Sequence, residues 1–269
     1  MPELPEVESA RAVIERSGLG RKIVEVDDTD TYVCRPHLPG QIRDALMGRT
    51  LVAAHRRGKS MWCDTSEDGP ELGIHLGMSG KIVIGDPDGS EVDGGDYWEG
   101  RRLPGDYRWT RFALTFADGG RLMLVDPRRL GRVRLDPPVE ALGPDAATIT
   151  PAGFRAALGF GTAPVKARLL DQEAVAGIGN LLADQILWSA RINPGRRVDK
   201  LTTDDVNRLL RATRTAVREA IRDGGVHTLK VIPFRTAGGR CPRDGAPMVK
   251  STVGGRTSWW CSREQALSG

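Results

Sequence analysis

Two residues at the N-terminus, Pro2 and Glu3, place an amine beside a carboxyl group. Initiator methionine is usually removed when a small residue follows, so we expect the mature chain to begin with Pro2. A free secondary amine can attack an aldehyde-like carbon and form an iminium, as lysine does elsewhere, and roughly a tenth of an α-amino group is unprotonated at neutral pH. Glu3 can accept and donate the protons of such a step. The ordinary alternative is a helix start, which favours both residue types.

Other segments carry residues whose role depends on their setting. Lys59 follows a strand, Met78 lies in a glycine-rich turn, and the loop 126–131 contains Arg128 and Leu130. Taken alone, the lysine and the arginine are solvated surface charges, and the methionine is a core residue.

The segment 177–180, Gly-Ile-Gly-Asn, immediately precedes an apolar helical pattern. Glycines let the backbone approach a phosphate, and a helix N-terminus offers free N–H groups and the positive end of a dipole. The alternative is a glycine turn with Asn180 as a plain N-cap. Both interpretations start a helix at this point.

The N-terminal half is predicted to be one helix followed by β-structure. Apolar residues at helical spacing indicate a helix over 6–17, which two glycines end. From residue 22 to residue 135, β-rich runs alternate with turns, which indicates a β-sandwich or barrel. We interpret the Gly/Asp-rich segment 85–96 as a surface loop. The predicted strands are 23–26, 50–54, 61–64, 82–84, 112–116 and 122–125.

The C-terminal half is predicted to be helical. Thr150 and Pro151 are typical of a helix N-cap and first turn, and the tail from residue 240 is Gly-rich and β-like. The predicted helices are 151–158, 164–172, 180–190 and 202–223. The fold class is therefore α+β: a catalytic N-terminal helix and β-sandwich domain (1–135), a linker (136–150), a helical domain (151–239) and a β-hairpin finger (240–269).

Composition and charge limit the classes of function. The chain is 39% hydrophobic and 28% charged, and it contains no run of 18 apolar residues and no secretory signal pattern, so we expect a cytoplasmic protein without a membrane partner. Residues 1–150 hold 20 Lys/Arg against 25 Asp/Glu, whereas residues 151–269 hold 19 against 10. A basic half suits a phosphate-backbone binder, although it can also simply aid solubility. Four cysteines are too few for a disulfide framework, and we expect Cys34 and Cys63 in the core.

The N-terminal octapeptide, Met-Pro-Glu-Leu-Pro-Glu-Val-Glu, resembles the start of the formamidopyrimidine-DNA glycosylase and endonuclease VIII family. Further similar motifs follow in the family's order across nearly the whole chain: 56–59, 75–80, 126–131, 177–180 and the tail from residue 241. The resemblance implies a helix–two-turns–helix element over 151–239. It also implies an enzyme that excises damaged bases and cuts the DNA strand.

The resemblance assigns roles to individual residues. It implies catalysis by Pro2 as nucleophile, with Glu3 and Lys59 in support. Met78, Arg128 and Leu130 would fill the duplex gap that an extruded nucleotide leaves. The further implied DNA contacts are Glu6, Lys166, Asn180 and the finger-tip Arg256.

Three departures from the family pattern bear on function. Position 130 is leucine instead of the common phenylalanine, so it cannot stack on a base. The stretch 224–240 is shorter than the family loop that closes over oxidised guanine, which favours lesions other than oxidised guanine as substrates.

The third departure is in the finger, which has the family's zinc-hairpin spacing. Its four ligand positions hold two thiols and two carboxylates, whereas structural zinc prefers thiolate and imidazole. We therefore expect a metal-free finger and no required cofactor; the degenerate positions are Cys241, Asp244, Cys261 and Glu264.

The leading interpretation is a monomeric bifunctional DNA glycosylase and AP lyase of base excision repair. Its partner would be double-stranded DNA with damaged bases or abasic sites, at the nucleoid if the source is bacterial. The alternative is a damaged-DNA or DNA-structure binding protein without turnover. An unrelated hydrolase has no support, because the turn 77–80 is not a nucleophile elbow and the sequence has no Walker loop.

Overall fold

The computed structural model describes residues 2–96 and 107–266. It divides into two compact units, one of residues 6–139 with Pro2, the other of residues 140–266 with Glu3–Pro5. Each unit has its own hydrophobic core.

The N-terminal helix α1 spans Leu4–Ser17 and begins two residues before the predicted start. Pro5 is accommodated because the N–H groups of a first helical turn have no intrahelical acceptor. The predicted apolar positions form one buried face, which packs against residues of both sheets of the first unit: Val7, Ala10, Val13 and Ile14.

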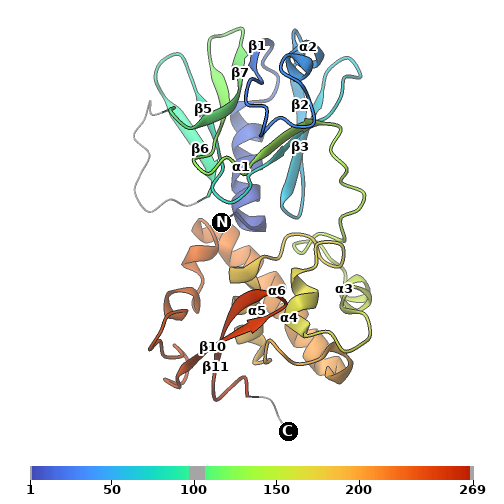
Figure 1. Cartoon of the computed structure of the whole chain (residues 1–269), viewed down its shortest axis with the longest axis vertical. Helices are drawn as coiled ribbons and strands as arrows, with labels where there is room; N and C mark the ends of the chain where they lie inside the picture. The colour runs from blue at the N-terminus through green and yellow to red at the C-terminus, as the bar shows by residue number, and fades with distance from the viewer. Residues whose placement is uncertain (1, 97–106, 267–269) are drawn as a thin grey trace. The chain divides into compact units, whose positions relative to one another are not determined.

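Two antiparallel sheets form the β-sandwich of the first unit (Figure 1). One has the order β1-β7-β8-β5-β6 and the other β2-β3-β4-β9. The bounds in the first sheet are β1 Ile23–Asp27, β7 Thr110–Phe116, β8 Arg121–Val125, β5 Lys81–Gly85 and β6 Glu91–Gly95. Those in the second are β2 Leu51–Arg57, β3 Ser60–Thr65, β4 Leu72–His75 and β9 Arg132–Leu135.

The interpretation of 85–96 as a loop was wrong, because β6 within it pairs with β5 along its whole length. Its glycines have a packing reason. A Cβ on Gly94 would lie 2.5 Å from the carbonyl oxygen of Ser9, so the backbone of β6 touches α1 directly. The short elements β4, β9 and α2 (Gln41–Leu46) were also not predicted. The predicted burial of Cys34 and Cys63 is confirmed, and it raises the pKa of each thiol to about 12.

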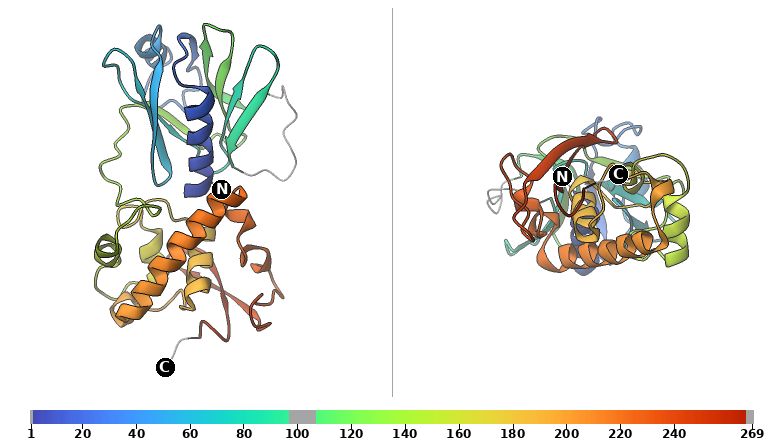
Figure 2. Two further views of the ribbon diagram at one scale, coloured as in Figure 1. Left: turned by 180° about the vertical axis from the view of Figure 1, so that it is seen from behind. Right: turned by 90° about the horizontal axis from the view of Figure 1, so that it is seen from below.

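The second unit is built on helix α5, which lies between α6 on one side and a β-hairpin on the other (Figure 2). The helices are α3 Pro151–Leu158, α4 Val165–Leu170, α5 Asn180–Ala190 and α6 Thr203–Asp223, with 3-10 turns η1 Val198–Lys200, η2 Val226–Thr228 and η3 Ile232–Phe234. The four predicted helices and the Thr150 N-cap are confirmed. Ala146 and Ile149, inside the predicted linker, are buried in this unit's core.

The predicted terminal hairpin is confirmed as β10 (Met248–Val253) paired with β11 (Arg256–Cys261). Its two-residue turn, Gly254-Gly255, has φ angles of 58° and 71°. Glycine adopts this left-handed conformation without the steric cost of a Cβ. Together these elements confirm the α+β fold class. Over the described residues, no helix has the length and apolar character needed to cross a membrane.

Candidate active site and nucleic-acid interface

Glu3 is fully buried in the second unit, where its carboxylate occupies the N-terminus of α5. Its Oε2 accepts hydrogen bonds from the backbone nitrogens of Gly179 and Leu182, both at 3.0 Å, and Oε1 accepts one from Leu181 at 2.8 Å. Backbone N–H groups and the helix dipole stabilise the carboxylate form. A side chain 176 positions away therefore completes this helix start.

The glycine directly before α5 is required by this contact. A Cβ on Gly179 would lie 2.2 Å from Cδ of Glu3, so any larger residue displaces the carboxylate. Gly179 is the N-cap, and Asn180 is the first helical residue, so the plain N-cap alternative for Asn180 was wrong.

Asn180 is half-buried as a residue, whereas its amide Oδ1 is buried and finds no hydrogen-bond partner among the residues that the structure describes. A 180° rotation of the amide exchanges Oδ1 and Nδ2, so the same position can present two N–H donors. Such a group can serve a phosphate oxygen.

In the first unit, Glu8 of α1 ties the helix to the turn that carries Lys59. Burial raises the pKa of the Glu8 carboxyl, but hydrogen bonds from Arg11 and Arg56 outweigh it, and the net shift is downward. Arg56 donates to Glu8 at 2.8 Å and to the carbonyl of Gly58 at 3.1 Å. Lys59 occupies the two-residue turn between β2 and β3 and is half-buried.

The N-terminal residues Pro2 and Glu6 also belong to the first unit, and both are buried.

The charge of Lys59 acts on the nearby ring of His75. Burial lowers the pKa of His75, and the charges of Lys59 and Arg134 lower it further. The neutral ring accepts a hydrogen bond at Nδ1 from the backbone of Gly77, at 3.0 Å.

The turn with Met78 and the loop with Arg128 and Leu130 lie against each other. A Cβ on Gly77 would be 2.4 Å from the carbonyl carbon of Leu130, so the two backbones are in direct contact. Met78 and Leu130 are each 36% exposed, and Arg128 is exposed. The structure thus brings the three predicted gap-filling residues onto one surface of the first unit.

Asp126 holds this pair of turns together, and it is not among the site residues predicted from the sequence. The side chain is fully buried. Its Oδ2 accepts from the backbone nitrogens of Leu130 and Gly131, both at 2.7 Å, while Oδ1 accepts from the nitrogen of Arg128 and the hydroxyl of Ser79. An aspartate directly before a Pro-Arg-Arg turn was the available signal, because Asp commonly accepts from the backbone two residues on.

The structure contradicts the expectation that Lys166 contacts DNA. Its side chain is 0% exposed, and Nζ donates to Asp184 at 2.6 Å, to Ser258 at 2.8 Å and to the carbonyl of Thr257 at 3.0 Å. An ammonium group has three donors, and all three are used within the protein. Arg256, at the start of β11, is by contrast exposed.

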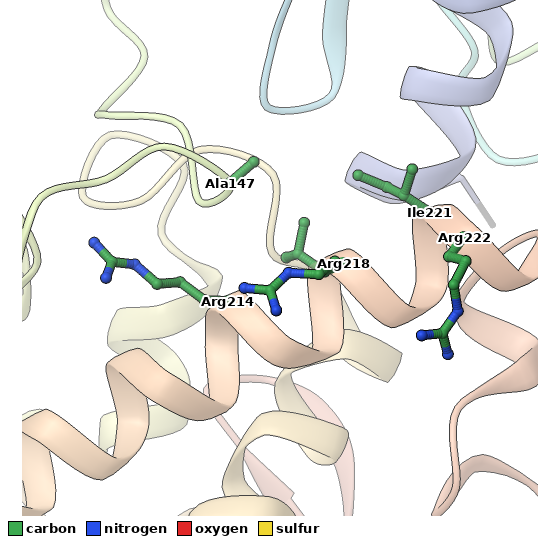
Figure 3. A pocket seen from close by; sticks show the side chains of 6 residues that line it. Ala147, Arg214, Arg218, Ile221 and Arg222 are labelled. Carbon is green, nitrogen blue, oxygen red and sulfur yellow. The ribbon is translucent and has the colours of Figure 1, made fainter.

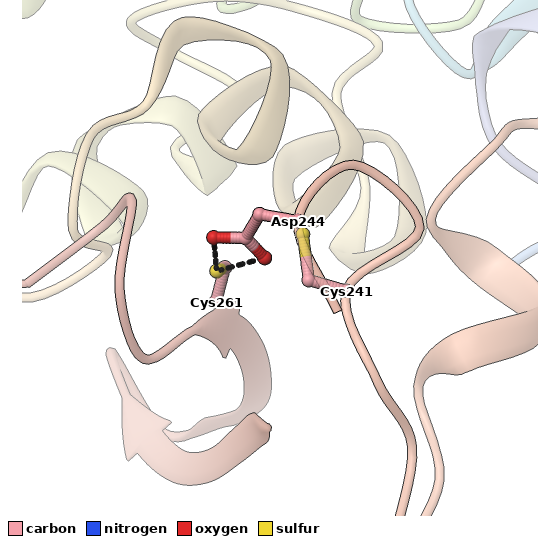
Figure 4. Close-up of side chains that lie close together, drawn as sticks. All are labelled: Cys241, Asp244 and Cys261. Carbon is pink, nitrogen blue, oxygen red and sulfur yellow. Dashed lines mark hydrogen bonds between the residues drawn. The ribbon is translucent and has the colours of Figure 1, made fainter. Parts of the chain in front are cut away.

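The degenerate finger positions converge only in part (Figure 4). The thiols of Cys241 and Cys261 and the carboxylate of Asp244 lie within 4.8 Å of one another. Glu264, the fourth position, is instead ion-paired with Arg243. Burial raises the pKa of the Cys261 thiol. Two sulfurs and one oxygen do not complete a tetrahedral structural zinc site.

A separate basic surface lies on α6. Three arginines at successive helical turns border an open pocket of about 500 Å³, over apolar side chains of the same helix (Figure 3). Its lining residues are Ala147, Arg214, Val217, Arg218, Ile221 and Arg222. None of the predicted site residues is among them.

Known proteins are similar to this chain in sequence and fold over nearly its whole length. Residues 1–133 match the formamidopyrimidine-DNA glycosylase N-terminal domain, and residues 141–231 match its H2TH domain. The formamidopyrimidine-DNA glycosylase of Chloroflexus aurantiacus is 34% identical over 284 residues, which cover 97% of this chain and 96% of that protein. A solved complex between Lactococcus lactis Fpg and DNA containing an abasic site has a TM-score of 0.81 and 27% identity, and it covers 98% of this chain and 99% of that one.

The fold and the matched domains together define a DNA-processing enzyme. The chain belongs to the formamidopyrimidine-DNA glycosylase family. It is a DNA glycosylase of base excision repair, and AP lyase activity is typical of this family.

Proposed function

We propose that the amine of Pro2 is the nucleophile of a bifunctional DNA glycosylase and AP lyase. The bond between the base and C1′ breaks, and the base leaves with the electron pair and a proton. The Pro2 nitrogen bonds to C1′ and loses its own proton; the C1′–O4′ bond of the sugar ring then opens, O4′ takes a proton, and the nitrogen lone pair forms the iminium with C1′. Loss of a C2′ proton then expels the 3′ phosphate, and loss of a C4′ proton expels the 5′ phosphate. Water finally adds to C1′ of the iminium, which frees Pro2 as the amine and leaves an aldehyde on the sugar fragment.

The placement of Glu3 is the observation that carries this proposal. It follows Pro2 directly, and three backbone N–H groups of the α5 N-terminus hold its carboxylate in one position. A fixed anion beside the amine can stabilise the cationic iminium and exchange the protons of base departure.

The remaining residues would bind the DNA. Lys59, Asn180 and Arg256 would hold phosphates, and Glu6 would lie beside the lesion. Met78, Arg128 and Leu130 would enter the duplex gap, which fits their exposed positions on two touching turns. The Oδ1 of Asn180, which has no hydrogen-bond partner among the described residues, supports the assignment of this amide as a phosphate contact.

We also propose that the enzyme favours oxidised pyrimidines and ring-opened purines over 8-oxoguanine. The stretch 224–240 packs on α5, where Val231 is fully buried and its backbone donates to Gln185 at 3.0 Å. A segment anchored in this way is poorly suited to close over a base. Lactococcus lactis Fpg has been solved with an oxidised pyrimidine and with Fapy-dG in the DNA. A lesion panel under single-turnover conditions tests this preference, and fastest excision of 8-oxoguanine would refute it.

Borohydride trapping on DNA with an abasic site tests the nucleophile. The matched pair is protein confirmed by mass to begin at Pro2, and protein with one extra residue before Pro2, whose nitrogen is then an amide. Met1 itself lies outside the described residues. We expect a covalent adduct only from the first, with equal binding of an uncleavable abasic analogue by both. Tight binding with no adduct and no nicking by the first protein would overturn the proposal in favour of a non-catalytic binder.

A further inference from the structure

The start of β11 is attached to the helical core by three consecutive residues. Thr257 accepts through its carbonyl, Ser258 accepts through its hydroxyl, and Trp259 donates through its backbone nitrogen. The first two contacts are made by Lys166 of α4 and the third by Asp184 of α5. All three directly follow Arg256 in the sequence.

Asp184 is the centre of this attachment and is 1% exposed. Its Oδ1 accepts from Lys166 at 2.6 Å, and its Oδ2 accepts from Trp259 at 3.1 Å and from Arg235 at 2.8 Å. Every oxygen and every ammonium hydrogen of the pair is thus satisfied, which a buried ion pair requires to be tolerated. Burial lowers the pKa of Lys166, but the adjacent carboxylates of Asp184 and Glu3 oppose that shift.

The turn of the hairpin adds a steric contact beside the ion pair. A Cβ on Gly254 would lie 2.9 Å from Cβ of Ala167, the residue that follows Lys166. Side chains two apart on a strand share a face, so Arg256 and the fully buried Ser258 leave β11 on the same side. Fixing Ser258 therefore also fixes the direction in which Arg256 leaves the strand.

We propose that Lys166 and Asp184 are positioning residues that hold β11 on α5 and thereby present Arg256 to DNA, through contacts that need no metal. This role rests on the proposed function of Arg256 as a phosphate contact. The pair acts through the arginine and does not touch DNA itself. Their buried positions distinguish this role from a direct contact.

A double-mutant cycle in DNA affinity tests the proposal. The variants are Lys166→Met, Arg256→Ala and the combination, with Lys200→Met as the control because that lysine is exposed and lies elsewhere in the unit. Affinity for a duplex with an uncleavable abasic analogue is measured against salt concentration. Removal of a single phosphate-binding cation lowers the slope of log affinity against log salt by about 0.9.

We expect Lys166→Met and Arg256→Ala each to lower the slope by about 0.9, and the combination to lower it no further. Additive effects in the combination would show that Lys166 binds DNA directly and would overturn the proposal. If Arg256→Ala alone leaves the slope unchanged, the proposed phosphate binding by Arg256 fails.

Hydrogen exchange tests separately whether Lys166 and Asp184 hold β11 on α5. We expect the amides of 257–260 to exchange at least about tenfold faster in Asp184→Asn than in wild type, which corresponds to about 1.4 kcal/mol. Unchanged exchange rates of these amides in both Asp184→Asn and Lys166→Met would refute the proposed attachment of β11 to α5.

Discussion

Replacement of Asp126 by alanine tests the idea that one buried carboxylate organises the two DNA-facing turns. The substitution removes the acceptor of the Ser79 hydroxyl and of three backbone N–H groups, those of Arg128, Leu130 and Gly131. The Ser79 and Gly131 donors are buried, and each costs ~1–3 kcal/mol when left unsatisfied. The donors of Arg128 and Leu130 regain water and cost less. We therefore expect the first unit to lose about 3–5 kcal/mol of its free energy of unfolding.

The measurement must report on the first unit alone, because two units need not unfold together. Hydrogen exchange of peptides covering 75–80 and 126–131, followed across a urea series, meets this need. Asp126→Asn keeps one oxygen and should lose about half as much as the alanine variant. Asp118→Ala is the control, since that carboxylate also accepts a backbone hydrogen bond but is exposed. An Asp126→Ala unfolding free energy within about 0.5 kcal/mol of wild type, the range of ordinary surface substitutions, would refute the reasoning.

Three further outcomes are expected. Gly179→Ala should slow base excision about 10- to 100-fold, which raises the activation free energy by about 1.4–2.7 kcal/mol, because the new Cβ displaces Glu3. The control is Gly85→Ala, whose Cβ meets nothing closer than 3.4 Å and which should leave the rate unchanged. The pKa of His75 is lowered in the folded protein, so below about pH 6.5 the unfolded state binds more protons, and the free energy of unfolding decreases as the pH is lowered. His75→Gln should flatten that part of the pH–stability curve, and a slope unchanged from wild type would contradict this. Dialysis against a chelator should leave DNA affinity within about twofold, since the contacts of Lys166 and Asp184 require no metal; a decrease that zinc restores would show that the metal positions the finger.

The sequence alone determined the order and type of most elements and the family. Helical spacing predicted the four C-terminal helices, and alternation with turn residues predicted most strands, because both signals arise from neighbours in the chain. The N-terminal octapeptide and the motifs that follow it predicted the glycosylase family. The two short strands β4 and β9 escaped prediction, since four residues carry too little periodicity.

The tertiary structure decided what the polar side chains do. The family resemblance implied that Lys166 contacts DNA, but the chain returns about ninety residues later and β11 accepts hydrogen bonds from this lysine. Glu3 meets its helix start across 176 positions, and Asp126 meets Ser79 across 47. A charged side chain is solvated or buried according to what packs against it from distant parts of the chain. Local sequence does not contain that information, because burial and pairing of charges are properties of the folded core.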